Sequence, residues 1–477
     1  MQFNSFPYMV FLVVAVSVFW FLPPRLRPPF VLLASLAFYA TWGAVFIAVP
    51  LLIATIVFFA GKQVSANPLK ARQWMWLGIS CVLFLLIFYK YRDFALVNFN
   101  AVLHWMAARP ITFAKSIALP VGISFYTFEA IGYLVDVRQG RVKPMRFMSL
   151  CLFFLFWPNV LSGPIVRARE LAPQLKFEQK FEPRFAFEGI DRLIWGLVQK
   201  NAIANVLGIW VDKGFHLGSS GPLSTVDGWF LAIAFGLQIY VDFAGYTNMA
   251  VGAARLLGVT LPENFRQPYH AATPADFWSR WHMTLSRWIR DYLFFPINSR
   301  WKGASIPLYT SLLGVMMAVG LWHGAGWNFI LWGFMHGAYL VLYRMYESVR
   351  MTRPVLGSSR IISGAWRFFT LIAVTAAWVP FRSPNMQKAG SILFSMFLRF
   401  SAAREFSLPF YWITVGVALF CVVEPLLLRK LDELDELAGV NGPSLFRIVC
   451  RPLAYTVGFL LFMLFDEHNA QFIYSQF

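Results

Sequence analysis

Apolar stretches long enough to enter or cross a lipid bilayer recur along the whole chain. A membrane-spanning helix needs about 20 mainly apolar residues, so the pattern predicts an all-α membrane protein with about ten to thirteen membrane segments. Several stretches are short or interrupted by Pro and Gly, and we expect some of them to be re-entrant or interfacial. The candidates are residues 6–22, 29–41, 44–60, 74–91, 112–135, 147–166, 187–211, 227–257, 306–323, 326–345, 364–381, 408–428 and 448–465.

Composition agrees with a surface that faces lipid. Of the 477 residues, 58% are hydrophobic and 13% are charged, and the mean hydropathy is +0.58. Soluble domains are about one-quarter charged, so this chain lacks the polar side chains that a water-facing exterior needs. No linker divides the sequence. We expect a single membrane-embedded domain over residues 1–477, with a catalytic core at approximately 120–345.

Two further segments give smaller expectations. The first apolar stretch has no Lys or Arg before it and ends at Pro23-Pro24-Arg25, so it is expected to be a retained helix rather than a cleaved signal peptide. The segment 430–439 is expected to be a charged helical-turn region and a solvated loop.

The formal net charge of +18 reflects membrane topology rather than nucleic-acid binding. Basic residues lie in short loops between apolar stretches, as at Arg138, Arg141, Lys143 and Arg146. Such loops orient membrane spans and attract anionic lipid head groups. The expected partners are therefore membrane lipids. Four cysteines are scattered without a CxxC pair, which favours neither a disulfide framework nor a zinc site.

One stretch, residues 264–302, combines dense aromatic residues with a higher charge density. Spacings of three and four predict an amphipathic helix with Trp, Leu and Tyr on one face and Ser, Thr, Arg and Asp on the other. The apolar face comprises Trp278, Trp281, Leu285, Trp288 and Tyr292, and the polar face Ser279, Arg280, Thr284, Arg287 and Asp291. A Trp-rich helix of this kind is typical of the membrane interface, where a lipid or carrier head group lies.

Three of the seven histidines are candidate site residues. His282 falls on the apolar face of the amphipathic helix, where it is either a packed structural residue or a site residue. His323 closes an apolar stretch, and the glycines that follow it permit a helix break or the close approach of a substrate. A neutral imidazole is a natural general base for a hydroxyl. His336 is either a second site residue or a helix-packing residue.

The other histidines and the buried acids have simpler interpretations. His104, His216 and His468 lie near charges at segment ends and are expected at the surface, and His270 lies in a loop. Asp242 lies within an apolar stretch and needs a partner, such as Arg255 or an arginine of the amphipathic helix. A structural ion pair is favoured over catalysis for Asp242, and the same holds for Glu129.

No rival motif competes with the histidines. The sequence contains no Walker A loop, GxGxxG, GxSxG or HExxH motif, and no metal ligand is expected. Paired broken helices in corresponding halves, which are typical of secondary transporters, are also not evident.

The same histidine-containing segments carry a family resemblance. RQPYHAATPADFWSRWHMTLSRWIRDYLFFPI (266–297) and GLWHGAGWNFILWGFMHG (320–337) closely resemble the membrane-bound O-acyltransferases (MBOATs), in particular their bacterial polysaccharide (alginate-type) O-acetyltransferase branch. Supporting matches are SFYTFEAIGYLVDV (124–137), FWPNVLSGPIVR (156–167), QIYVDFAGYTNMAVGAARLLG (238–258), WVPFR (378–382) and FIYSQF (472–477). The resemblance thus spans nearly the whole chain. It departs from the family pattern at Met335, at Ser475 and around 430–439.

The resemblance implies a ring of tilted helices around a tunnel whose cytosolic and outer funnels meet at His323. His323 matches the family's invariant histidine, and His282 matches its second active-site position. By that resemblance, both are expected to be catalytic, with His323 as base or orienting group and His282 stabilising the donor carbonyl. The expected walls of the tunnel are Trp278, Trp281, Trp322 and His336, with Asp242 and Arg287 as further candidates.

The implied function is transfer of an acyl group, expected to be acetyl, from a cytosolic donor towards exopolysaccharide or cell-wall hydroxyls. No bound cofactor is expected, and the donor would be acetyl-CoA or an acyl carrier protein. Expected partners are a periplasmic acetyltransferase and a polysaccharide synthesis and export complex at the bacterial inner membrane. The alternatives are a transporter of an acylated carrier, a non-catalytic scaffold, or D-alanyl transfer to teichoic acid.

Overall fold

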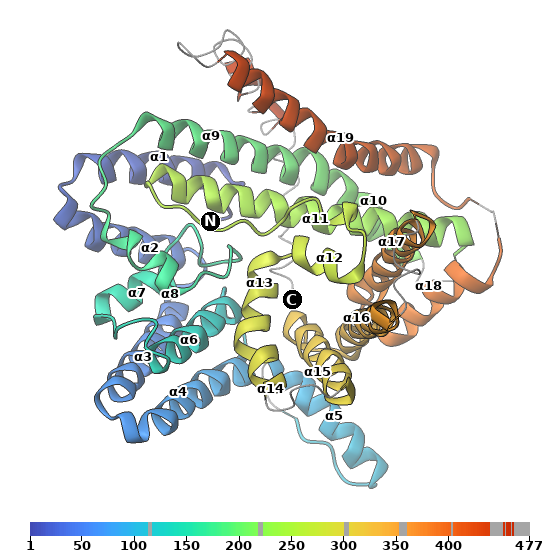
Figure 1. Ribbon diagram of the computed structural model, residues 1–477, viewed down its shortest axis with the longest axis horizontal. Coiled ribbons are helices and arrows are strands. Elements are labelled where there is room, and N and C mark those ends of the chain that lie inside the picture. The colour runs from blue at the N-terminus through green and yellow to red at the C-terminus, as the bar shows by residue number, and fades with distance from the viewer. Residues whose placement is uncertain are drawn as a thin grey trace. The chain divides into compact units, whose positions relative to one another are not determined.

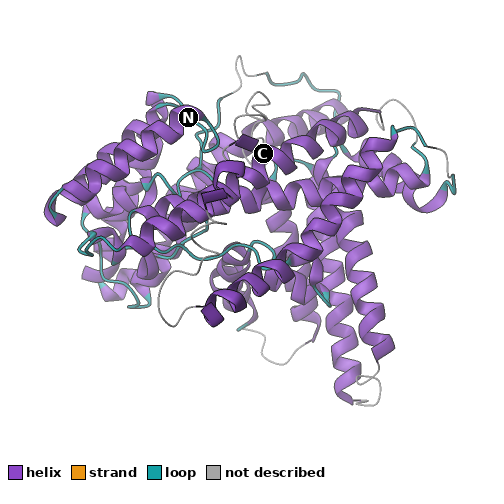
Figure 2. Ribbon diagram, turned by 90° about the horizontal axis from the view of Figure 1, so that it is seen from above, coloured by secondary structure: helices purple, strands orange, loops and turns teal. Residues whose placement is uncertain are grey.

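The computed structural model describes residues 1–112, 117–217, 223–299, 305–352, 360–401 and 404–438, with residues 452–453, 455–458 and 460–461. These residues form helices and loops, with no strand among them, which confirms the predicted all-α fold (Figures 1 and 2). His468, Ser475 and the terminal match 472–477 lie outside the described residues, as does most of the predicted stretch 448–465.

Within the described residues, four helical stretches are long and apolar enough to cross a membrane: Ala44–Ala66, Pro68–Trp105, Thr225–Leu256 and Arg360–Arg382. Phe6–Phe21 and Leu408–Glu424 are shorter apolar helices. Their outer faces carry large apolar side chains such as Phe59, Phe84 and Phe368, each more than 60% exposed. Such faces are suited to lipid rather than to water.

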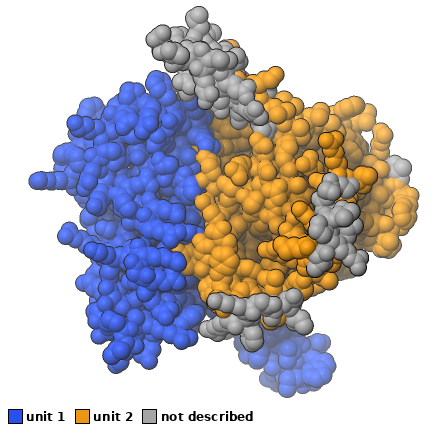
Figure 3. Space-filling model, in the orientation of Figure 1, with its two compact units in different colours: residues 1–193, 249–262 blue, residues 194–248, 263–477 orange. Residues whose placement is uncertain are grey.

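The chain divides into two compact units, which Figure 3 distinguishes by colour. Unit 1 comprises residues 1–193 and 249–262, and unit 2 comprises residues 194–248 and 263–477. The helices α9 (Pro183–Leu197) and α11 (Thr225–Leu256) contribute residues to both. The expectation of a single domain with a core at 120–345 stays a prediction.

Unit 1 is built around a group of packed helices. Its elements are α1 (Phe6–Phe21), α2 (Arg27–Ala40), α3 (Ala48–Ala66), α4 (Ala71–Leu86), α5 (Arg92–Trp105), α6 (Ile123–Arg138), α7 (Phe147–Leu155) and α8 (Ala168–Leu171). Helices α3, α4 and α6 pack against one another, and α7 packs on α2 and α3. The Nδ2 of Asn159 donates to Oε1 of Glu129 at 3.1 Å, so this partner of the buried acid is an amide rather than a cation.

Two predicted membrane stretches of unit 1 are shorter helices than expected. The helix predicted over 112–135 begins only at Ile123, because Gly122 adopts a left-handed conformation with φ 77°. A side chain at Gly122 would overlap the carbonyl of Val160, so the turn needs glycine. The helix predicted over 147–166 ends at Leu155, and residues 156–166 continue as a buried segment without helix.

Unit 2 contains the histidine motifs. Its further helices are α10 (Asn205–Leu217), α12 (Pro274–Arg280), α13 (Met283–Ile289), α14 (Phe295–Asn298), α15 (Ser305–His323), α16 (Trp327–Thr352), α17 (Arg360–Arg382), α18 (Met386–Leu398) and α19 (Leu408–Ala438). Helix α15 packs on α16, α16 on α17 and α17 on α18 (Figure 1). Helix α19 extends to Ala438, so the charged segment is helical, and the loop expected there is wrong.

Candidate active site

The predicted amphipathic helix is broken in the middle, which corrects the prediction of one continuous helix. Helix α12 ends at Arg280, α13 begins at Met283, and a π-helical turn follows over Arg290–Phe294. The apolar residues Trp278, Trp281, Leu285 and Trp288 are each at most 9% exposed. The aromatic face therefore packs inside the protein.

His282 lies at the break and has a left-handed backbone, with φ 41° and ψ 54°. This conformation is uncommon for a residue other than glycine. Asn264 holds the chain there. Its carbonyl accepts from the Met283 N–H at 2.9 Å, and its Oδ1 accepts from Oγ1 of Thr284 at 2.6 Å. Asn264 is fully buried, yet no sequence pattern singled it out.

The His282 ring is buried, as its place on the apolar face predicts. The ring of Phe243, from α11, lies edge-on to it at 4.8 Å between centroids, and the ring of Trp322 lies at 6.3 Å. Burial lowers the pKa of His282 to about 3. The ring is therefore neutral at physiological pH, with one nitrogen that donates and one that accepts.

His323 is the last residue of α15, and the glycine segment 324–326 separates it from α16. The predicted helix break is confirmed. The space beside the glycines is not left for a substrate, however, because side chains on Gly320 and Gly324 would overlap the backbone and ring of Phe329. These glycines instead allow α15 and α16 to approach closely.

Aromatic rings enclose His323, which is 3% exposed. The ring centroids of Trp322, Trp332 and Phe381 lie 4.8, 5.0 and 5.3 Å from that of His323. Because Trp322 contacts both His323 and His282, its indole joins the two histidines into one buried cluster.

His336 extends the cluster along α16. Its ring lies 4.8 Å from Trp332 and 5.3 Å from Trp278 between centroids. Among the described residues, Nε2 of His336 and the indole N–H groups of Trp278, Trp332 and Trp378 have no hydrogen-bond partner. Each such buried group costs about 1–3 kcal/mol. The wall thus offers one imidazole nitrogen and three N–H donors that could bind a polar ligand.

Asn328 fixes the neighbouring wall. Its Nδ2 donates to the carbonyls of Pro380 at 3.2 Å and Ser383 at 2.8 Å, joining the start of α16 to the end of α17. This places Phe381 against His323, and Trp378 lies 4.9 Å from Trp281 between ring centroids. The sequence signal for these residues was the WVPFR match, which by itself assigned them no role.

Two further predicted site residues, Asp242 and Arg287, make polar contacts of their own. Asp242 forms a buried ion pair with Lys200 at 2.6 Å, which confirms the favoured structural ion pair. The partner suggested for it, Arg255, instead pairs with Glu188 in unit 1. Lys200 lies in a π-helical turn, Val198–Ala204, that residue spacing did not reveal. Arg287 is exposed and donates to the Met283 carbonyl at 3.3 Å.

The described residues include no group of three His, Cys, Asp or Glu side chains that could hold a metal ion. The ring cluster combines neutral imidazoles, which can accept or donate a proton, with indole N–H donors, and these side chains are buried.

The helical fold and the buried histidines agree with a family of membrane enzymes that the sequence matches. Residues 83–381 match the membrane-bound O-acyltransferase family. The chain belongs to that family and is a multi-pass membrane O-acyltransferase.

Its relatives act in related chemistry. The chain is 33% identical over 395 residues to the probable alginate O-acetylase AlgI of Azotobacter vinelandii, covering 81% of this chain and 76% of that one. It is 34% identical over 399 residues to the peptidoglycan O-acetyltransferase of Helicobacter pylori, covering 76% and 72%. Identity to the teichoic acid D-alanyltransferase of Bacillus subtilis is 30% over 277 residues, covering 55% and 67%.

Proposed function

We propose that this O-acyltransferase moves an acetyl group from a cytosolic thioester across the membrane, towards hydroxyl groups of an exopolysaccharide or cell-wall polymer. The observation that carries the proposal is the pair of buried histidines, His282 and His323, joined through the ring of Trp322. Relatives named for O-acetylation of alginate and of peptidoglycan support acetyl as the acyl group.

In the proposed reaction, His323 is the general base. It accepts the proton of the acceptor hydroxyl while the oxygen attacks the thioester carbonyl carbon. An N–H of neutral His282 donates to the carbonyl oxygen, where negative charge develops. The tetrahedral intermediate collapses as the carbon–sulfur bond breaks, and the thiolate takes the proton from His323. The products are an acetyl ester and a free thiol.

The donor in this proposal is acetyl-CoA or an acetylated carrier protein, and no resident cofactor takes part. A polymer outside the bilayer cannot meet a cytosolic thioester, so the acetyl group has to be handed over at the outer side. We infer that a periplasmic acetyltransferase, within a polysaccharide synthesis and export complex, receives it at the bacterial inner membrane. The walls formed by Trp278, Trp281, Trp322 and His336 would then line the transfer path.

Acetyl transfer by the purified protein tests this function. Proteoliposomes receive radiolabelled acetyl-CoA and a soluble hydroxyl acceptor, and the release of free thiol is measured. We expect His323→Ala to lower turnover by about 10²–10⁴-fold, because it removes the general base. The exposed His104 offers a matched control, and His104→Ala should keep normal turnover.

Unchanged turnover in His323→Ala would refute the proposed role of His323. Continued export of acylated material without thiol release would favour a transporter of an acylated carrier, and the absence of acyl exchange altogether would favour a scaffold.

A second candidate function is D-alanyl transfer, which the similarity to the Bacillus subtilis D-alanyltransferase supports. The same assay distinguishes the two functions when a D-alanyl thioester replaces acetyl-CoA. Turnover with the D-alanyl donor but not with acetyl-CoA would show that D-alanyl, rather than acetyl, is the transferred group. The proposed roles of the histidines would then stay the same.

A further inference from the structure

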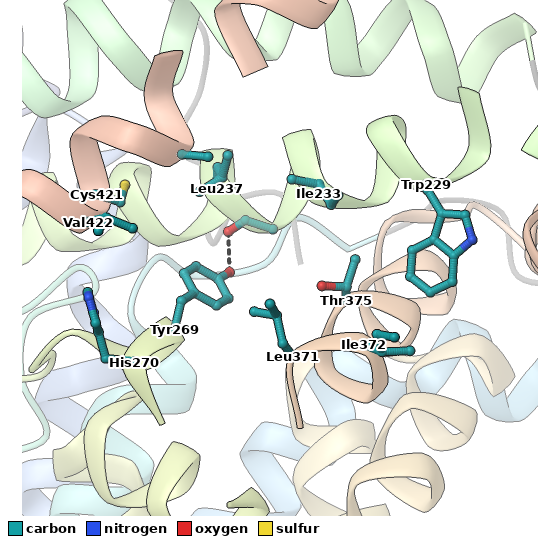
Figure 4. A pocket seen from close by; sticks show the side chains of 12 residues that line it. Trp229, Ile233, Leu237, Tyr269, His270, Leu371, Ile372, Thr375, Cys421 and Val422 are labelled. Carbon is teal, nitrogen blue, oxygen red and sulfur yellow. Dashed lines mark hydrogen bonds between the residues drawn. The ribbon is translucent and has the colours of Figure 1, made fainter. Parts of the chain in front are cut away.

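An apolar pocket of about 390 Å³ lies in unit 2, apart from the histidine cluster (Figure 4). Small-molecule pockets have volumes of about 300–1,000 Å³, so this one can hold a ligand. Helices α11, α17 and α19 and the turn Pro268–His270 form its walls. The lining side chains include Trp229, Ile233, Leu237, Leu371, Ile372 and Val422.

The pocket opens towards the lipid-facing surface. Helices α11 and α17 are two of the long apolar helices, and the part of α19 that lines the pocket is apolar as well. Two lining residues, Leu371 and Val422, are themselves 47% and 49% exposed. Neighbouring side chains outside the pocket, Phe368 and Leu419, are also exposed. An apolar cavity with such a rim is open to the hydrocarbon of the bilayer.

One end of the pocket is polar, and two arginines lie near it. The hydroxyl of Tyr269 donates to the Gly236 carbonyl, so both groups are satisfied without a ligand. His270 lines the same end (Figure 4). Burial lowers the pKa of His270, and the nearby positive charges of Arg280 and Arg367 lower it further. Arg280 is paired with Asp276 at 2.7 Å, whereas Arg367 is exposed.

We propose that this pocket binds one acyl chain of an anionic phospholipid, with the head-group phosphate at His270 and Arg367. The apolar walls match a hydrocarbon chain, and the polar end with its nearby arginines matches a phosphate group. The bilayer supplies both parts in one molecule, next to the opening. A free phosphate ion would leave the apolar volume empty, and an uncharged lipid would offer no counter-charge to Arg367.

Bound lipid would support the wall of the histidine cluster. A side chain on Gly236, in the pocket lining, would meet Cδ1 of Trp378 at 2.9 Å. The ring of Tyr269 lies 5.7 Å from that of Tyr240, which in turn lies 6.3 Å from that of Trp281, between centroids. Two rings, those of Tyr269 and Tyr240, therefore separate the lipid from Trp281, the residue that precedes His282.

Lipid retention measured by native mass spectrometry tests the proposal. The full-length protein is purified in detergent and titrated with phosphatidylglycerol or with phosphatidylcholine of the same acyl chains. We expect one tightly held phosphatidylglycerol and at least a several-fold preference over phosphatidylcholine. An excess of inorganic phosphate should not displace the lipid. Displacement by phosphate, or equal binding of both lipids, would overturn the proposed anionic phospholipid site.

Two matched pairs of variants locate the site. Ala418→Trp fills the pocket from α19, whereas Leu419→Trp adds the same ring at the adjacent, lipid-exposed position. Arg367→Gln removes the charge near the polar end, whereas Arg360→Gln removes an exposed charge at the start of the same helix. We expect about tenfold weaker retention for Ala418→Trp and loss of the phosphatidylglycerol preference for Arg367→Gln, with both control variants unchanged.

Retention by Ala418→Trp equal to that of the unmodified protein would refute the pocket as the site. If Ala418→Trp does not fold, Ile233→Trp fills the same volume from α11 and should give the same loss. This binding test needs no acyl donor. Its failure is therefore distinguishable from a failure of the proposed acetyl transfer.

Discussion

The backbone of His282 is held in a conformation that costs energy. A non-glycine residue in the left-handed region is strained by about 1–3 kcal/mol and persists only where its surroundings fix it. Here the buried Asn264 provides that restraint through its carbonyl and its side chain. In this backbone conformation the His282 ring packs between Phe243 and Trp322. Sequence spacing placed His282 on the buried face but could not reveal this backbone conformation.

Burial of His282 also makes a prediction about acid stability. Its pKa is about 3 in the folded protein and about 6.5 in the unfolded chain. Below pH 6.5 the unfolded chain binds a proton that the folded protein does not, so stability falls as the pH falls from about 6.5 towards 3. His282→Gln keeps an N–H donor but cannot titrate. Melting temperatures measured in detergent between about pH 7 and pH 4 should therefore fall less steeply in this variant.

The control is His104→Gln, which makes the same substitution at an exposed histidine. An equal slope in His282→Gln and in the unmodified protein would contradict the depressed pKa.

At the scale of elements, the helix pair α15 and α16 depends on glycine. A side chain on Gly320 would overlap the Phe329 carbonyl, and one on Gly333 would overlap that of Met316. The two helices therefore meet backbone to backbone, which draws Trp332 of α16 against His323 of α15. The glycine-rich segment after His323 allowed the sequence to predict this break.

Gly320→Ala should destabilise the helix pair and lower activity. The added methyl group cannot fit without moving α16 away from His323, and overpacking of this kind costs about 1–3 kcal/mol. Gly314 lies in the same helix with nothing within 4 Å of an added side chain. Gly314→Ala should therefore be neutral or stabilise by up to about 1 kcal/mol, since alanine favours helix.

Thermal unfolding and thiol release would be measured side by side for both variants. Equal stability of the two variants would show that α15 and α16 do not pack through Gly320.

The elements also show where prediction from sequence fails. The break at Trp281–His282 contains neither Gly nor Pro, and the apolar spacing continues in phase on both sides, so one continuous helix was the natural expectation. Likewise, Lys200 pairs with Asp242 across 42 positions of the chain, and Asn328 meets Ser383 across 55. Such contacts depend on tertiary packing. The hydropathy and the histidine motifs are local, which is why the helical fold and the site histidines could be predicted.

At the scale of the whole molecule, the excess of basic residues bears on the proposed donor. Lys and Arg number 41 against 23 Asp and Glu, which gives the net charge of +18. Acetyl-CoA carries several phosphate charges, so a field of this sign should attract it and raise its local concentration. Salt screens such attraction, since the Debye length falls from about 10 Å at 0.1 M to about 3 Å at 1 M.

We therefore expect the KM for acetyl-CoA to rise several-fold between about 0.05 M and about 0.5 M salt, because attraction of the donor weakens while the chemistry at His323 is unchanged. The kcat should stay constant over that range. A short, uncharged acetyl thioester provides the control, since its KM has no charge for salt to screen. If the KM values of both donors respond equally, salt acts on the protein rather than on the encounter with the donor, and the net charge has no part in donor capture.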